Sequence, residues 1–336
     1  MADVGLGQLA TVTGLARSKV LKDAVSDNIP GYDLMQAAGG VRRIAGGSQI
    51  VESAITAPNS TSTWVGETGQ VSINDTKVVD SAVFDWRYML CAVTWSLAER
   101  YKNSGGAQTQ YFDIIGAKYK AAEATMMNQF QEGFLSNGTG YSGLQLIGLA
   151  SLVSTTPTTG TVGGVDRSSA NAAWFRNQKF DTASDWSEGA TSPGNIKRFY
   201  DKGINATTRG GKRMKQVIYA GNTHFEYLTQ ATQAIQIIND NTGTGEAGFQ
   251  KIKYRGADVY LGGGINYSGY SALTATRSYI LCVEEGGVNI VFHDKAEFDM
   301  LEPVNSQDQA AVSRLLFTMT AATIGGLAKF NWVGFD

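Results

Sequence analysis

The sequence contains few of the residues from which metal and redox sites are built. Its 336 residues include only two cysteines and two histidines, Cys91, His224, Cys282 and His293. A structural zinc site needs four such ligands at close spacing, and these four are scattered along the chain. Both cysteines lie inside apolar runs, so we expect buried thiols in a reducing compartment, with a disulfide between them as the alternative.

Neither sign of charge is in excess, and no apolar run is long. The chain has 28 Lys and Arg against 30 Asp and Glu, a net charge of −2, whereas proteins that grip phosphates usually have a basic face. The longest apolar stretch, 144–153, is shorter than the roughly 20 residues that span a bilayer. The first basic residue is Arg17, so the N-terminus does not resemble a secretory signal. We therefore expect a cytosolic protein with no membrane partner.

Motifs for catalysis are also missing. No Gly-x-Ser-x-Gly elbow occurs at a strand-to-helix turn, and Gly210-Gly211-Lys212 lacks the remaining residues of a phosphate-binding loop. Glu284 and Glu285 are adjacent strand-end residues, whose side chains would point to opposite faces. A Ser/His/Asp trio can be drawn on paper with either histidine, but we interpret both histidines as structural. The sequence predicts that the protein is not an enzyme and has no catalytic residue, cofactor or metal site.

Glycine, in contrast, is abundant. The chain has 40 glycines, and charged residues make up only 17% of it, below the usual quarter. Surface that is neither core nor strongly charged is typical of protein–protein interfaces. A glycine-rich β protein with long loops has the same composition, so composition alone leaves both open.

The N-terminal part of the pattern predicts an arm followed by a projecting hairpin. Residues 1–45 have weak periodicity and balanced charge, which indicates an arm that packs on another surface and does not neutralise packaged nucleic acid. Within 46–82, alternating runs at 49–55 and 71–77 flank a breaker-rich tract, as in a long hairpin. A two-stranded hairpin is marginal alone in water, so this one needs a surface to lie on.

The rest of the chain predicts an α+β fold. Alternation over 83–97 predicts a long strand, and apolar residues at three- and four-residue steps predict a helix over 107–136 that stops at Asn137-Gly138. After the loop-rich tract 139–195 comes an α/β unit. Its predicted elements are helices at 196–204 and 223–238, strands at 215–220, 252–261, 279–284 and 288–293, and a long closing run that includes Leu315, Phe317 and Met319.

This order of elements resembles the major capsid proteins of tailed bacteriophages, whose fold is shared with encapsulins. Short stretches of the sequence also resemble that family. They are Met126-Met127-Asn128-Gln129-Phe130 through Phe134-Leu135-Ser136-Asn137-Gly138, Gly148–Val153, Gly160–Arg167 and Trp174-Phe175-Arg176-Asn177. The resemblance covers most of the chain, and it is a resemblance to the family as a whole.

The resemblance implies a domain organisation. Residues 1–45 would be the N-terminal arm and 46–82 the extended hairpin loop. Residues 83–138 and 278–322 would form a peripheral domain with the spine helix 107–136. Residues 139–277 and 323–336 would form an axial domain.

The resemblance also implies a function, in which copies of the chain form hexamers and pentamers of an icosahedral head around double-stranded DNA. Expected partners are the chain itself, a separate scaffolding protein, a portal, weakly contacted DNA and a decoration protein. The expected location is the virion, after assembly in the host cytoplasm and maturation of a precursor shell. An encapsulin-like shell is one alternative, and a Gly/Thr-rich β surface-binding protein is another.

Overall fold

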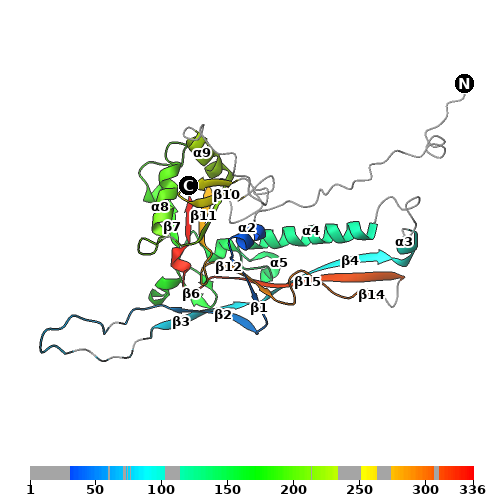
Figure 1. Ribbon diagram of the computed structural model, residues 1–336, viewed down its shortest axis with the longest axis horizontal. Coiled ribbons are helices and arrows are strands. Elements are labelled where there is room, and N and C mark those ends of the chain that lie inside the picture. Colours follow the sequence, from blue (N-terminus) through cyan, green and yellow to red (C-terminus); the bar gives the residue numbers. More distant parts are fainter. Residues whose placement is uncertain are drawn as a thin grey trace, which may run out of the picture.

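The computed structural model describes residues 31–59, 61–70, 73, 75, 77–102, 114–212, 214–233, 251–262, 274–305 and 310–336. Its shape is elongated (Figure 1). The lobe that contains the C-terminus lies above a long blade of sheet and helix, and a two-stranded hairpin leaves the molecule on the side opposite the tip of the blade.

The blade is built on a six-stranded sheet in which β15 has the most partners. The hydrogen-bonded path is β1-β12-β15-β13, and β4 and β14 also pair with β15. The strands are β1 (Val41–Ile44), β4 (Arg87–Ser96), β12 (Asn289–His293), β13 (Asp299–Met300), β14 (Val304–Asn305) and β15 (Ala311–Thr323). Strands β4 and β15 are antiparallel from Arg87 opposite Thr320 to Ser96 opposite Ala311, and this pair forms the length of the blade.

Helix α4 (Ile114–Phe134) lies along one face of this strand pair. Strand side chains alternate between the two faces, and Val93 and Trp95 of β4 point to the helix side, where they pack with Met126 and Leu316. The helix predicted over 107–136 is confirmed from 114, and 107–113 lie outside the described residues. It ends at Phe134, and Gly138 follows with a φ of +77°, which is the left-handed stop that Asn137-Gly138 indicated.

The lobe has a separate six-stranded sheet in the order β7-β16-β11-β8-β10-β9. Its strands are β7 (Gln178–Asp181), β8 (Gln216–Ala220), β9 (Lys251–Tyr254), β10 (Ala257–Leu261), β11 (Arg277–Cys282) and β16 (Trp332–Phe335). Helices α8 (Ile196–Ala206) and α9 (Asn222–Gln233) cover one face, around a core that includes Phe199, Ile218 and Trp332. The α/β unit predicted from 196 onward is therefore present, with the continuation of α9 outside the described residues.

The predicted hairpin is present, but its second strand lies later than expected. Strand β2 (Gln49–Ile55) pairs with β3 (Val79–Asp85), whereas the alternation had placed the returning strand at 71–77. The predicted strand 83–97 is consequently divided. Its first residues belong to the hairpin, and the chain changes sheet at Trp86, whose indole N–H donates to the Gly47 carbonyl at 2.9 Å.

Two segments pack differently from the expected domain organisation. Within 31–45, helix α2 (Tyr32–Ala37) buries Met35 completely and β1 is a parallel neighbour of β12, so these residues pack against the body of the same chain. Residues 1–30 lie outside the described part. Strand β11 lies at the start of 278–322, which the resemblance implied to be part of the peripheral domain, and it hydrogen-bonds with β8 and β16 in the lobe. The chain crosses from the lobe sheet to the blade sheet between β11 and β12.

Short elements complete the fold. They are α3 (Leu97–Lys102), α5 (Gly140–Gly143), α6 (Leu149–Leu152), β5 (Thr161–Val162), β6 (Val165–Asp166), η1 (Ala170–Phe175), α7 (Thr182–Asp185) and η3 (Ala328–Phe330). The β5–β6 hairpin supports the base of the larger hairpin, where the Val83 N–H donates to the Gly163 carbonyl at 2.8 Å.

Candidate assembly surfaces

The base of the β2–β3 hairpin is fixed to the blade by a partly buried ion pair. Glu52 of β2 accepts from the Arg42 guanidinium and, at 3.0 Å, from the Thr323 hydroxyl of β15. Beneath the strand, Gly325 and Gly326 leave no room for side chains, since an added Cβ at Gly326 would lie 2.9 Å from the Ala54 Cβ. The hairpin therefore leaves the body in a defined direction.

Beyond its base, the hairpin exposes apolar side chains that nothing in the described chain covers. Val51, Ile55 and Val79 on its outer face are 56%, 84% and 52% exposed. Toward the tip, Trp64 is fully exposed and Ile73 is 97% exposed. Burying apolar area is favourable by roughly 25 cal/mol per Å², so these side chains favour contact with another surface.

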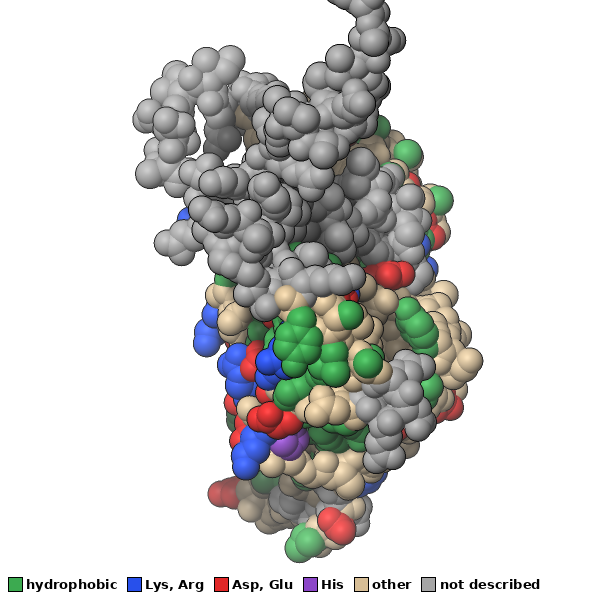
Figure 2. All heavy atoms as spheres, turned by 90° about the vertical axis from the view of Figure 1, so that its right-hand side faces the viewer, with side chains coloured by type: hydrophobic (Ala, Val, Ile, Leu, Met, Phe, Trp, Pro, Cys, Tyr) green, Lys and Arg blue, Asp and Glu red, His purple; other side chains and the backbone are tan. Residues whose placement is uncertain are grey.

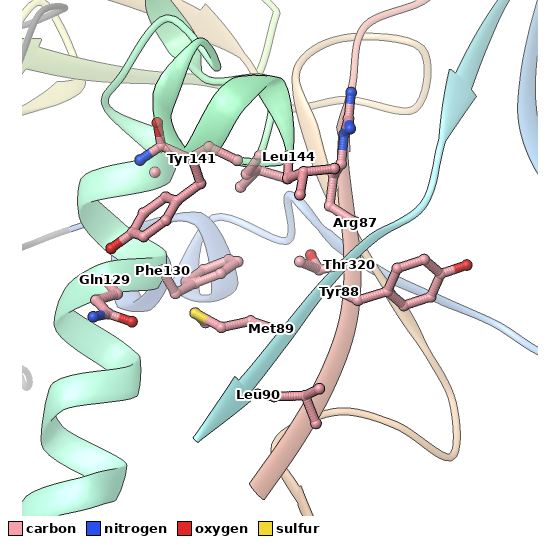
Figure 3. Close-up of a pocket in the computed structure, with 12 residues that line it drawn as sticks. Arg87, Tyr88, Met89, Leu90, Gln129, Phe130, Tyr141, Leu144 and Thr320 are labelled. Carbon is pink, nitrogen blue, oxygen red and sulfur yellow. The ribbon is translucent and has the colours of Figure 1, made fainter. Parts of the chain in front are cut away.

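A second apolar surface lies where the start of β4 faces the end of α4. A pocket of about 290 Å³ is lined by Met89, Phe130 and Leu146, with Tyr88 and Leu144 at its margin. In Figure 3, Met89 and Phe130 point toward one another across the pocket, while the Tyr88 ring points away from it on the other side of the strand. Tyr88 stacks on Phe317 of β15, with ring centroids 6.2 Å apart. The open face of the blade sheet is thus apolar next to the pocket.

The loop that borders this pocket is strained. Tyr141 and Ser142 both have positive φ, +52° and +58°, a conformation that is costly for residues other than glycine. Gln145 supports the loop by accepting from the Gly140 N–H at 3.2 Å. The loop holds Tyr141 and Leu144 outward at 71% and 68% exposure. Backbone strain of this kind clusters at functional sites, so the loop is a candidate contact surface.

Figure 2 looks at the molecule from the tip of the blade. Apolar side chains gather near the middle of the described part of this face, and charged side chains of both signs lie mixed along one side of it. This mixture agrees with the small net charge of the sequence. Among the described side chains of this face, no patch of a single sign is present that would favour a strongly charged partner.

The lobe brings together one serine, one histidine and one aspartate, and this trio includes His224, which the sequence had led us to interpret as structural. His224 Nδ1 lies 2.8 Å from Ser278 Oγ, and His224 Nε2 lies 3.7 Å from an Asp336 carboxylate oxygen. Ser278 and His224 are completely buried, and the Ser278 hydroxyl is also bonded to the Tyr200 hydroxyl at 3.0 Å. A substrate cannot reach this serine, so the trio is a structural network that joins α8, α9, β11 and the residue after β16.

Other chemistry-bearing residues do not form a site in the described part of the chain. His293 lies beside Asp294 at 3.4 Å and is partly exposed. Cys91 and Cys282 are both free thiols, and burial raises the pKa of Cys282 to about 11. Over the described ranges, no group of three or more His, Cys, Asp or Glu side chains is placed to hold a metal ion. None of the helices described there has the length and apolar character to cross a bilayer.

The whole architecture is similar to that of solved capsid structures. The chain superposes on the capsid asymmetric unit of cyanophage A-1(L) with a TM-score of 0.67, at 14% identity, over 97% of this chain and 98% of that one. It matches the capsid of a native GTA particle with a TM-score of 0.64, at 11% identity, over 100% and 99% of the two chains. The chain has the fold of phage capsid proteins.

The capsid fold extends to an encapsulin as well. The holo-SrpI encapsulin complex from Synechococcus elongatus PCC 7942 matches with a TM-score of 0.53, at 9% identity, over 100% of this chain and 95% of that one. No protein-family model matches the sequence, and no curated protein matches it. The α+β capsid fold predicted from the order of elements is confirmed.

Sequence reasoning located some of these surfaces and missed others. The hairpin was predicted from its alternation, and its need for a covering surface agrees with the exposure of Trp64 and Ile73. The pocket beside α4 was not predicted, because its walls come from parts of the chain that are far apart in sequence. A signal was present in Gly140-Tyr141-Ser142-Gly143, where an aromatic residue stands among turn-forming residues.

Proposed function

We propose that the protein is the major capsid subunit of a tailed-phage head, which self-assembles into hexamers and pentamers of an icosahedral shell around double-stranded DNA. The observation that carries this proposal is the match to phage capsid chains over essentially the full length of both proteins. The proposal assigns the protein to the virion, after assembly in the host cytoplasm. It includes a scaffolding protein, a portal, a decoration protein and weak contact with DNA as partners.

The exposed surfaces support self-association. Specific interfaces bury about 800 Å² on each partner, and a projecting hairpin with a fully exposed tryptophan supplies surface of that kind. In the proposed organisation, 46–82 is the extended loop that covers a neighbouring copy. The blade is the peripheral domain, and the lobe, now including β11, is the axial domain. Residues 1–30 remain the proposed arm.

An encapsulin-like shell is the second candidate, because the same fold occurs in the SrpI encapsulin. The TM-score is lower there than for the cyanophage capsid, which favours the phage head. A glycine-rich β surface-binding protein is disfavoured by the long α4 and by the full-length match.

Electron microscopy of the purified protein, alone and with candidate scaffolding proteins, tests the proposal. We expect closed particles from the wild-type chain. Trp64→Ser should fold normally, because Trp64 has no packing to lose, and should reduce particle yield at least tenfold. Gln70→Ala, an exposed polar change in the same hairpin, should assemble like wild type. Wild-type chains that stay monomeric under every condition would contradict the proposal.

A further inference from the structure

The pocket between the start of β4 and the end of α4 is large enough for a small molecule. Its volume is about 290 Å³, close to the size of the smallest ligand pockets of proteins. Met89, Phe130 and Leu146 line it, so much of its wall is apolar. Since an apolar cavity of about 150 Å³ holds one benzene molecule, this pocket admits an apolar body of roughly twelve non-hydrogen atoms.

Gly133 leaves part of this space open. It lies in the last turn of α4 and has no positive φ, so the helix backbone does not require glycine there. Glycine lowers helix stability relative to alanine. An added Cβ would lie 3.6 Å from the Gln145 Cγ and from the Leu146 Cβ, which is ordinary contact distance. Both of these neighbours line the pocket. What the glycine provides is therefore room on the pocket wall.

Arg87 places a positive charge at the margin of the same pocket. Its side chain is half-buried, and its Nε is shielded from solvent without a hydrogen-bond partner. Among the described residues, no carboxylate forms an ion pair with it. In Figure 3, Arg87 extends past Leu144, on the side of the pocket away from Gln129. A carboxylate at this margin would form a charge-assisted hydrogen bond with the guanidinium, which is stronger than a neutral one.

We propose that this pocket binds a small amphipathic monocarboxylate. Its apolar body lies between Met89 and Phe130, and its carboxylate accepts from the Arg87 guanidinium. Tyr141 and Leu144 at the rim are both exposed, so the ligand can enter from solvent. An occupant contacts α4, β4 and the adjoining loop together, and binding to the folded state alone raises stability by mass action. The site lies within one chain, so the inference does not depend on the proposed function.

Decanoate and decanol test the carboxylate, because the two have the same chain and only decanoate is charged. We expect decanoate to raise the thermal unfolding midpoint of the unassembled chain until the site is saturated. Isothermal titration calorimetry should show that decanoate binds roughly tenfold more tightly than decanol. Equal affinity for the two ligands would overturn the inference.

Arg87→Gln removes the positive charge from the margin. We expect this variant to bind decanoate roughly tenfold more weakly than wild type and to bind decanol equally well. Arg100→Gln is the matched control, because it makes the same change at an exposed position of α3. It should bind both ligands like wild type. Unchanged decanoate affinity in Arg87→Gln would overturn the inference.

Gly133→Leu tests the place of the apolar body. Leucine should fill the pocket and abolish decanoate binding. Gly133→Ala is its control, because the added methyl group lies at ordinary contact distance from its neighbours. It should keep most of the affinity. Decanoate binding by a folded Gly133→Leu chain with wild-type affinity would contradict the proposed site.

A labelling measurement on the wild-type protein decides the case in which Gly133→Leu fails to fold. Decanoate with a photo-reactive diazirine at the end of its chain should label peptides that contain Met89, Phe130 or Leu146. Excess unlabelled decanoate should prevent this labelling. Labelling confined to other segments, as non-specific binding to the exposed hairpin would give, would overturn the inference.

Discussion

Gly148 lies where the chain turns back past the C-terminal end of α4. A Cβ at this position would collide with the carbonyl oxygens of Gly133, Phe134 and Ser136, which are backbone atoms and cannot rotate away. The Ala150 N–H donates to the Ser136 carbonyl at 3.1 Å, so the two segments are already in hydrogen-bonding contact. Glycine is required here by close approach of backbone to backbone.

We expect Gly148→Ala to lower the free energy of unfolding by about 3 kcal/mol, because the end of α4 must shift to admit the methyl group. Gly66→Ala is the control, since an added Cβ there meets nothing within 4 Å. Urea unfolding of the unassembled chains measures both. Equal stability of the two variants would show that the end of α4 is not as closely packed as described.

Asp336 has the most strongly perturbed carboxylate in the described part of the chain. Burial alone would raise its pKa, but contact with His224 and hydrogen bonds from Thr191 and Thr182 outweigh burial and lower the pKa to about 2. The folded state therefore holds fewer protons than the unfolded state between about pH 4 and pH 2. The stability that this group contributes is complete above pH 4 and is lost as the pH falls through that window.

Asp336→Asn should remove this pH dependence. We expect wild type to be more stable than Asp336→Asn at pH 5 and the difference to shrink steadily toward pH 2. Denaturant unfolding at several pH values checks this, and Asp75→Asn, at an exposed hairpin position, serves as control. A wild-type advantage that persists unchanged at pH 2 would contradict the assigned hydrogen bonds.

At the scale of elements, the hairpin is held mainly at its base. The side chains of Arg42 and Glu52 are only 25% and 10% exposed, so removal of one charge leaves the other poorly solvated. We expect Glu52→Gln to weaken the hairpin base by about 2 kcal/mol, below the cost for a fully buried pair because Arg42 reaches solvent. Hydrogen exchange should speed up in β2 and β3 and stay unchanged in β8. Glu67→Gln near the hairpin tip should change neither, and protected β2 amides in Glu52→Gln would refute the role of the ion pair.

Elements with strong local periodicity could be predicted from sequence, and their ends could not. The spacing of apolar residues at three- and four-residue intervals predicted helix α4, and Asn137-Gly138 predicted where it stops. Alternation through 83–97 is continuous, so the break at Trp86 was hidden. It arises from a bond between the Trp86 indole and Gly47, two residues far apart in sequence. The sheet to which β11 belongs could not be predicted for the same reason, because a buried apolar run does not reveal its hydrogen-bonding neighbour.

At the scale of the whole molecule, β2 lies beside the lobe, and residues 51–56 line one pocket together with Trp174 and Phe330. Packed interfaces switch between discrete arrangements, so we propose that the hairpin and α4 reorient when a precursor shell matures. Amides of β2 should differ in hydrogen-exchange protection between particles before and after genome filling. Amides of β8 in the lobe core should not differ. Identical protection of β2 in the two particles would contradict the reorientation.

The sequence by itself determined the fold class, the order of elements and the presence of a hairpin that needs a partner surface. These three features depend on local periodicity, turn residues and composition, all of which are set by residues that are close together in the sequence. Tertiary structure alone decided the place of the returning strand β3, the packing of 31–45 and the sheet that holds β11. It also decided the Ser278–His224–Asp336 network and the pocket beside α4. These depend on hydrogen bonds and packing between distant segments, which no local pattern encodes.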